Sequence, residues 1–171
     1  MKAAPISLVD YFATDLSLAT NRNFAADKAV QFVDSEFLVD VALKPISPTT
    51  PTDRVWQVTL EVRHTPGPET NFAYSYRVVL VGQFSVAPRV EKTEEERTVR
   101  IHGASVLYGM AREIVRALTG RGPFRPVILP TVSFYEQRVA VSAVTESPGL
   151  PPSLPDSAPK PAKKRRAAKE T

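Results

Sequence analysis

Residues 55–64 alternate strictly between two kinds of side chain, and this alternation restricts the fold more than any other feature of the sequence. One set of alternate positions carries the bulky, mostly apolar side chains Trp56, Val58, Leu60, Val62 and His64. Because neighbouring side chains of a strand point to opposite faces, a period of two over ten residues predicts a β-strand with one buried and one wetter face. The chain therefore needs a sheet that is covered on one side.

Three other segments have the composition of strands. Residues 72–86 repeat the alternation, and the short Pro-Gly-Pro connection predicts that they pair antiparallel with residues 55–64. Residues 37–44 alternate in the same way, whereas residues 6–18 are rich in β-favouring side chains but alternate less regularly. The polar stretch 19–32 is interpreted as a crossover loop between these two strands.

A helix is predicted over residues 104–119, where two apolar strips share one segment. The first consists of Leu107, Ala111, Ile114 and Leu118, and the second of Ala104, Tyr108 and Val115. A helix that is apolar on two sides needs two partners, so we expect it to lie between the sheet and another subunit. Gly120 is expected to end this helix in the left-handed conformation.

Two flanking segments are less regular. Residues 94–102 predict a turn or a short helix before the main one. Residues 134–144 predict a short C-terminal helix, although their β-branched side chains leave a strand open. The expected fold class is therefore α+β, with a four-stranded sheet, a long helix and a short C-terminal helix packed on it.

The C-terminal residues 146–171 differ from the rest of the chain in composition. They are rich in proline and serine and carry six basic and three acidic residues, which leaves 16 basic and 15 acidic residues in 1–145. We expect one domain over 1–145 and a disordered basic tail over 146–171. The run 163–166 could contact phosphates or acidic lipid, or have no partner, while the nearly neutral domain gives no sign of nucleic-acid binding.

The residue patterns of common catalytic and cofactor sites do not occur in the sequence. There is no cysteine, which excludes thiolate nucleophiles, disulfides and zinc–thiolate sites. His64 and His102 stand in no metal-ligand or catalytic spacing, and the seven glycines form no phosphate-binding loop. We therefore expect a protein that is not an enzyme and needs no cofactor or metal. Polar and acidic residues in 1–15, where a signal peptide needs an apolar stretch, lead us to expect a cytoplasmic protein.

Several aromatic side chains fall outside the alternating strips, in loops or at the ends of elements. They are Phe24, Phe32, Phe124, Phe134 and Tyr135. Such residues can close the ends of a core, or they can line an apolar groove. Both interpretations stay open at this point.

Short motifs occur in a fixed order between residues 6 and 137. Residues 12–17 fit an aromatic-x-x-Asp-hydrophobic-Ser pattern, and residues 107–113 fit Leu-aromatic-x-x-Ala-Arg-Glu. The motifs Arg121-Gly122-x-Phe124 and Leu129-x-x-Val132-x-Phe134 follow. In this order they resemble the SecB family of bacterial protein-export chaperones. Gly109 and Met110 depart from the Pro and Tyr that are common in the family at these positions.

The resemblance implies an ATP-independent chaperone that holds unfolded polypeptides as a homotetramer, a dimer of dimers with its long helices between two sheets. It implies a client groove for which the candidate residues are Phe24, Phe32, Val33, Phe37, Leu38, Phe124, Leu129, Phe134 and Tyr135. It also implies a subunit interface on the helix, with Leu107, Tyr108, Ala111, Val115 and Leu118 as candidates.

The resemblance further implies a sheet face that docks the translocation motor SecA through acidic residues. One such acid is present as Asp15, but Ala19 and Arg77 stand where two other acids are expected. Because like charges repel, docking of SecA in the usual way is in doubt. Two alternatives remain beside preprotein holding: a chaperone dedicated to one partner, such as an antitoxin of a toxin–antitoxin system, and an adaptor that binds nucleic acid or a membrane surface through its tail.

Overall fold

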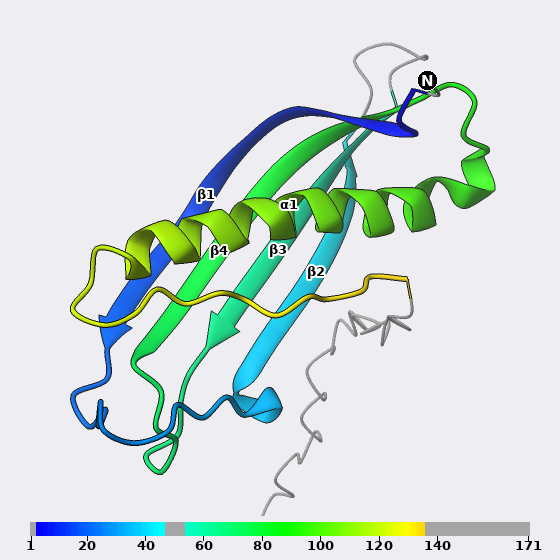
Figure 1. Cartoon of the computed structure of the whole chain (residues 1–171). Coiled ribbons are helices and arrows are strands. Elements are labelled where there is room, and N and C mark those ends of the chain that lie inside the picture. Colours follow the sequence, from blue (N-terminus) through cyan, green and yellow to red (C-terminus); the bar gives the residue numbers. More distant parts are fainter. Residues whose placement is uncertain (1–2, 47–53, 136–171) are drawn as a thin grey trace, which may run out of the picture. The chain divides into compact units, whose positions relative to one another are not determined.

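The computed structural model describes residues 3–46 and 54–135, all within one compact unit that ends at Arg138. Four strands, two short 3-10 helices and one long helix make up the described part of this unit (Figure 1). In chain order they are β1 (Ile6–Thr20), η1 (Asp34–Glu36), β2 (Phe37–Ile46), β3 (Val55–His64), β4 (Tyr74–Val86), η2 (Lys92–Glu94) and α1 (Glu95–Thr119). The four-stranded sheet and the long helix confirm the predicted fold class.

The strands form one antiparallel sheet in the order β1-β4-β3-β2. β1 and β2 therefore occupy opposite edges, and the crossover loop between them runs along one end of the sheet (Figure 1). The register places Leu60 opposite Leu80, which sets the apolar side chains of β3 and β4 on the same face. Two register shifts in β1, at Val9 and Thr14, explain why its alternation is irregular in the sequence.

Helix α1 crosses one face of the sheet, and the core lies between them (Figure 1). The approach is close, because a Cβ added to Gly103 on α1 would lie 2.9 Å from Cγ2 of Val58 on β3. The space at Gly82 on β4 is equally limited, since a Cβ added there would lie 2.9 Å from the Leu107 side chain of the helix. These two glycines let the helix backbone approach the sheet at the centre of the core.

The helix begins earlier than predicted, at Glu95 instead of Ala104. Its first turn is attached to the sheet, because Glu95 accepts hydrogen bonds from the Arg54 side chain and from Trp56 Nε1, the latter at 3.3 Å. These contacts are tertiary and leave no periodic signal in the sequence. Gly120 does end the helix, but with a φ of −67° instead of the left-handed conformation predicted for it.

After α1 the chain returns in an extended conformation alongside the helix, over the same face of the sheet (Figure 1). Leu129 and Phe134 of this segment are buried, and Tyr108 Oη donates a 2.6 Å hydrogen bond to the Pro130 carbonyl. Of the predicted C-terminal helix, only residues 134 and 135 are described; the rest, and the tail 146–171, lie outside the described residues. Within the described ranges, no helix is both long and apolar enough to cross a membrane.

Candidate functional site

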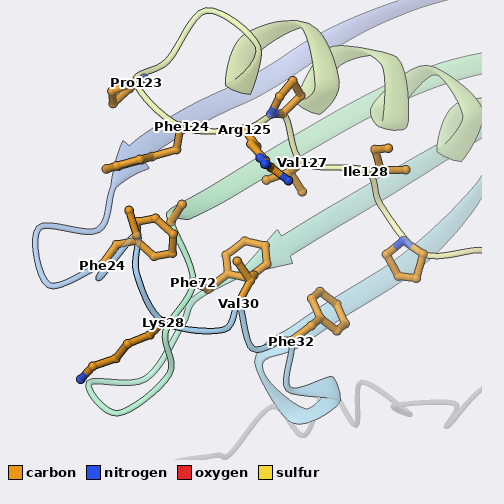
Figure 2. Close-up of a pocket in the computed structure, with 14 residues that line it drawn as sticks. Phe24, Lys28, Val30, Phe32, Phe72, Pro123, Phe124, Arg125, Val127 and Ile128 are labelled. Carbon is orange, nitrogen blue, oxygen red and sulfur yellow. The ribbon is translucent and has the colours of Figure 1, made fainter.

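A groove of about 920 Å³ opens between the crossover loop and the extended segment after α1 (Figure 2). Three separate parts of the chain line it: residues 24–32 of the loop, Phe72 and Ala73 before β4, and residues 123–130. The lining is mainly apolar and includes Phe24, Val30, Phe32, Phe72, Phe124, Val127 and Ile128. Its charged members are Lys28 and Arg125.

The wall formed by residues 123–130 is fixed by polar contacts to the sheet and to the end of α1. Tyr74 Oη accepts a 3.1 Å hydrogen bond from the Phe124 amide and lies 3.2 Å from the Thr119 carbonyl, to which it can donate. Thr119 Oγ1 accepts a 2.9 Å hydrogen bond from the Val127 amide. A Cβ on Gly122 would lie 2.5 Å from Tyr74 Oη, so this wall can rest on the tyrosine only because residue 122 is glycine.

The opposite wall, the crossover loop, is held by Asn71 in the connection between β3 and β4. Its side-chain amide donates to the carbonyls of Ala25 and Ala29 at 3.1 and 3.0 Å, while its Oδ1 accepts from the Ala25 amide at 2.9 Å. The Gln31 amide donates to the Asn71 carbonyl. One asparagine therefore shapes the loop that presents Val30 and Phe32 to the groove.

The rings of Phe24 and Phe124 meet across the groove edge to face, with centroids 4.8 Å apart. At the other end Phe32 stacks on His64, with centroids 5.2 Å apart and an interplanar angle of 7°. His64 is fully buried, and neither ring nitrogen has a hydrogen-bond partner among the described residues. Burial lowers the pKa of His64, because the charged imidazolium would lose its hydration. The backbone of Tyr74 and the nearby Glu36 carboxylate favour the charged form and only partly oppose this effect.

Of the candidate client-groove residues, the structure brings Phe24, Phe32 and Phe124 together in the groove. Phe37 packs behind Phe32, with ring centroids 5.4 Å apart. The other predicted residues lie elsewhere: Leu129 and Phe134 are buried in the core, and Val33, Leu38 and Tyr135 are exposed but do not line the groove.

Val30 and Ile128 also line the groove, although the sequence did not predict them as groove residues, and they are 63% and 74% exposed. Large apolar side chains this exposed are unusual when they gather in one hollow. Their sequence context could have indicated this role: Val30 lies in a polar loop and Ile128 lies between prolines, so neither belongs to the apolar face of a strand or helix.

The candidate subunit-interface residues mostly lie inside the single chain. Leu107, Tyr108, Ala111 and Val115 are buried in the core of their own chain, and Leu118 is half-buried. Their surfaces therefore already have a partner within the chain. Val106 is an exposed large apolar side chain of α1, and Met110 and Ile114 are half-buried.

The predicted docking residues lie on the sheet face opposite α1, where Arg77 binds two acids. It donates to Glu61 at 2.8 and 3.0 Å and forms an ion pair with Asp15. Its hydrogen bonds lower the pKa of Glu61. Ala19 is exposed beside this cluster. Asp15 is thus paired with an arginine that it shares with Glu61.

The lining of the groove offers mainly apolar contact, together with the cationic side chains of Lys28 and Arg125. Within residues 3–46 and 54–135, no cluster of three or more His, Asp or Glu side chains could hold a metal ion. The groove's lining includes no carboxylate, imidazole or hydroxyl-bearing side chain. The arrangement is suited to binding an apolar chain segment.

Comparison with known proteins identifies a matching family. The family model described as preprotein translocase subunit SecB matches residues 2–142. No curated protein sequence matches the chain. A protein of unknown function from Streptococcus agalactiae shares the fold, with a TM-score of 0.51 and 11% identity over 76% of this chain and all (100%) of that one.

The SecB-like chaperone Rv1957 of Mycobacterium tuberculosis was solved in complex with a ChAD peptide from the Rv1956 HigA1 antitoxin. It is similar to this chain with a TM-score of 0.48 and 18% identity, over 75% of this chain and 91% of that one.

Proposed function

The chain belongs to the SecB family of chaperones, and on this premise we propose that it holds unfolded polypeptides in the groove between the crossover loop and residues 123–130. The observation that carries the proposal is the exposure of Val30, Phe32 and Ile128 in one hollow. Exposed apolar surface lowers solubility, so its concentration in a shaped groove supports a binding role.

The physical basis of holding is burial of apolar side chains from the client. Each square ångström removed from water contributes about 25 cal/mol, and the interaction is non-directional. A groove that offers Phe24, Phe32 and Phe124 can therefore accept many apolar sequences. Several such contacts along one client add through multivalency, without nucleotide hydrolysis.

The proposed role in the cell is to keep preproteins unfolded before export. The cluster of Arg77 with Asp15 and Glu61 favours a second candidate, a chaperone dedicated to one partner such as an antitoxin. Arg77 offsets part of the acidic charge that would attract SecA at these positions, which supports holding without the usual delivery to that motor.

We extend the proposal to a homotetramer, because the edge strand β1 has apolar side chains exposed on both faces. Leu16 pairs with Val78 and so shares the helix-covered face, but it is 50% exposed. Phe12 pairs with Val81 on the opposite face and is 48% exposed. A second copy that continues the sheet from β1 would cover both faces, and the strip of Val106, Met110 and Ile114 on α1 could then join two such dimers.

The test is suppression of aggregation. A chemically denatured protein is diluted into buffer without ATP, and light scattering is followed with increasing amounts of this chain. We expect the scattering to fall even when there is less than one tetramer of this chain for each molecule of the denatured protein. Scattering that is unaffected at every ratio contradicts the holding function.

A further inference from the structure

The charged side chains of the groove lining indicate which kind of polypeptide segment the groove would bind. Lys28 and Arg125 are the charged residues among those that line the groove, and both are basic and exposed. No Asp or Glu of the described residues lines it; Asp27, next to Lys28, does not. A groove with cations and no carboxylate has a one-sided potential, although the folded domain as a whole is nearly neutral.

Arg125 is placed to contact an occupant. Figure 2 shows it projecting from residues 123–130 toward the middle of the groove, while Lys28 extends along the rim away from the aromatic side chains. Within the described part of the chain, Arg125 forms no ion pair and donates no side-chain hydrogen bond. Its planar guanidinium can grip a carboxylate through two parallel hydrogen bonds.

We propose that the groove selects client segments in which aromatic or aliphatic residues are interspersed with aspartate or glutamate, with Arg125 binding a client carboxylate. This inference rests on the proposed holding function. The aromatic lining would bury the apolar side chains of the segment, and the acid between them would meet Arg125 at the open side. A segment carrying lysine or arginine at the same place would be repelled.

Charge also argues against two other occupants. The tail of this chain, residues 146–171, carries six basic and three acidic residues, so the groove does not attract it. A double-stranded nucleic acid would satisfy the two cations, but its bases are stacked inside the duplex, so the phenylalanines of the groove would face a highly charged backbone. An acidic and apolar polypeptide satisfies both parts of the lining.

The test uses the full chain and three fluorescent 15-residue peptides with identical apolar residues. Two spaced positions are Asp in the first peptide, Asn in the second and Lys in the third. At low ionic strength we expect the Asp peptide to bind about tenfold more tightly than the Lys peptide, since each exposed charge pair contributes modestly. The difference should shrink as salt is added.

Arg125→Glu should reverse this order, and Arg125→Gln should reduce the difference to about threefold. The matched control is Arg121→Gln, an exposed arginine that does not line the groove and should leave the order unchanged. A preference for Asp that survives unchanged in a Lys28→Gln/Arg125→Gln variant assigns the attraction to other cations, such as the tail, and overturns the proposal. Equal affinities for all three peptides overturn the charge preference alone, whereas no binding of any peptide overturns the holding function as well.

Discussion

His64 is the residue whose environment most directly predicts a measurable pH dependence. Its buried ring lies against the rings of Phe32, Phe72 and the titratable Tyr76 of β4, and the Glu36 carboxylate of η1 lies 3.9 Å from its Nε2. Because burial lowers the pKa of His64 in the folded state, the unfolded chain binds more protons below about pH 6.5. The free energy of unfolding should therefore fall as the pH drops from 6.5 toward the lower folded pKa.

Urea unfolding of the wild type and of His64→Phe between pH 5 and 8 measures this effect. The phenylalanine keeps the aromatic packing but cannot take a proton, so the variant should lose most of the slope between pH 5 and 6.5. The pKa of Glu36 is lowered, chiefly by its hydrogen bond from Thr70, so its own titration falls below this window. Equal slopes in the two proteins would show that another group is responsible.

Arg77 allows a second prediction at the level of single residues. Arg77→Ala removes the partner of both Asp15 and Glu61, but the site is partly exposed, and water screens the loss. We expect a cost of about 1 kcal/mol in the free energy of unfolding. In a double-mutant cycle, Glu61→Gln should cost less in the Arg77→Ala background than in the wild type. Additive effects of the two substitutions would contradict the observed pairing.

Residue type and context predicted part of the groove. Phe24, Phe32 and Phe124 stood out because aromatic side chains in polar loops have no role in a helix or strand. Val30 and Ile128 did not stand out in the sequence, because their exposure depends on how Asn71 holds the crossover loop and Tyr74 holds residues 123–130. Leu129 and Phe134 had the same kind of context as the groove residues, but the path of the chain after α1 buries them.

Among the elements, the contact of α1 with the sheet depends on Gly103. An alanine there places a Cβ 2.9 Å from Val58 and 3.4 Å from Phe84, so the helix or these side chains must shift. We expect Gly103→Ala to lower the free energy of unfolding by about 1–3 kcal/mol.

Gly109 on the same helix is the matched control, because a Cβ there meets nothing within 4 Å. Gly109→Ala should stabilise the protein by about 0.5–1 kcal/mol through helix propensity alone. Thermal or urea unfolding measures the change in the free energy of unfolding for both variants. Opposite signs support the close approach of helix and sheet, and stabilisation by both substitutions contradicts it.

Strands were easier to predict than the helix start or the segment after the helix. β3 was predicted residue by residue, because strict alternation follows from one covered face. The first turns of α1 were not, since Arg54 and Trp56 hold them from the sheet. Residues 123–135 have no periodicity at all, because their position depends on single contacts such as that between Tyr108 and Pro130.

For the whole molecule, the apolar surface of β1 and α1 predicts self-association. The mass in solution, measured by light scattering after gel filtration, should be four times that of the chain. Val106→Asp places a charge at an exposed position of α1 and should reduce the mass while helix content by circular dichroism is kept. A wild type that stays monomeric at micromolar concentration contradicts the tetramer.

The central claim is that the groove between the crossover loop and residues 123–130 binds unfolded polypeptide, and its affinity for a permanently unfolded protein tests this most directly. Val30→Asp/Ile128→Asp changes two exposed groove residues and should weaken binding about tenfold or more, because both apolar contacts are lost. Val33→Asp changes an exposed valine of the same loop that lies outside the groove and should bind like the wild type. Equal affinities of the wild type and the double variant in a fluorescence anisotropy titration would contradict the account.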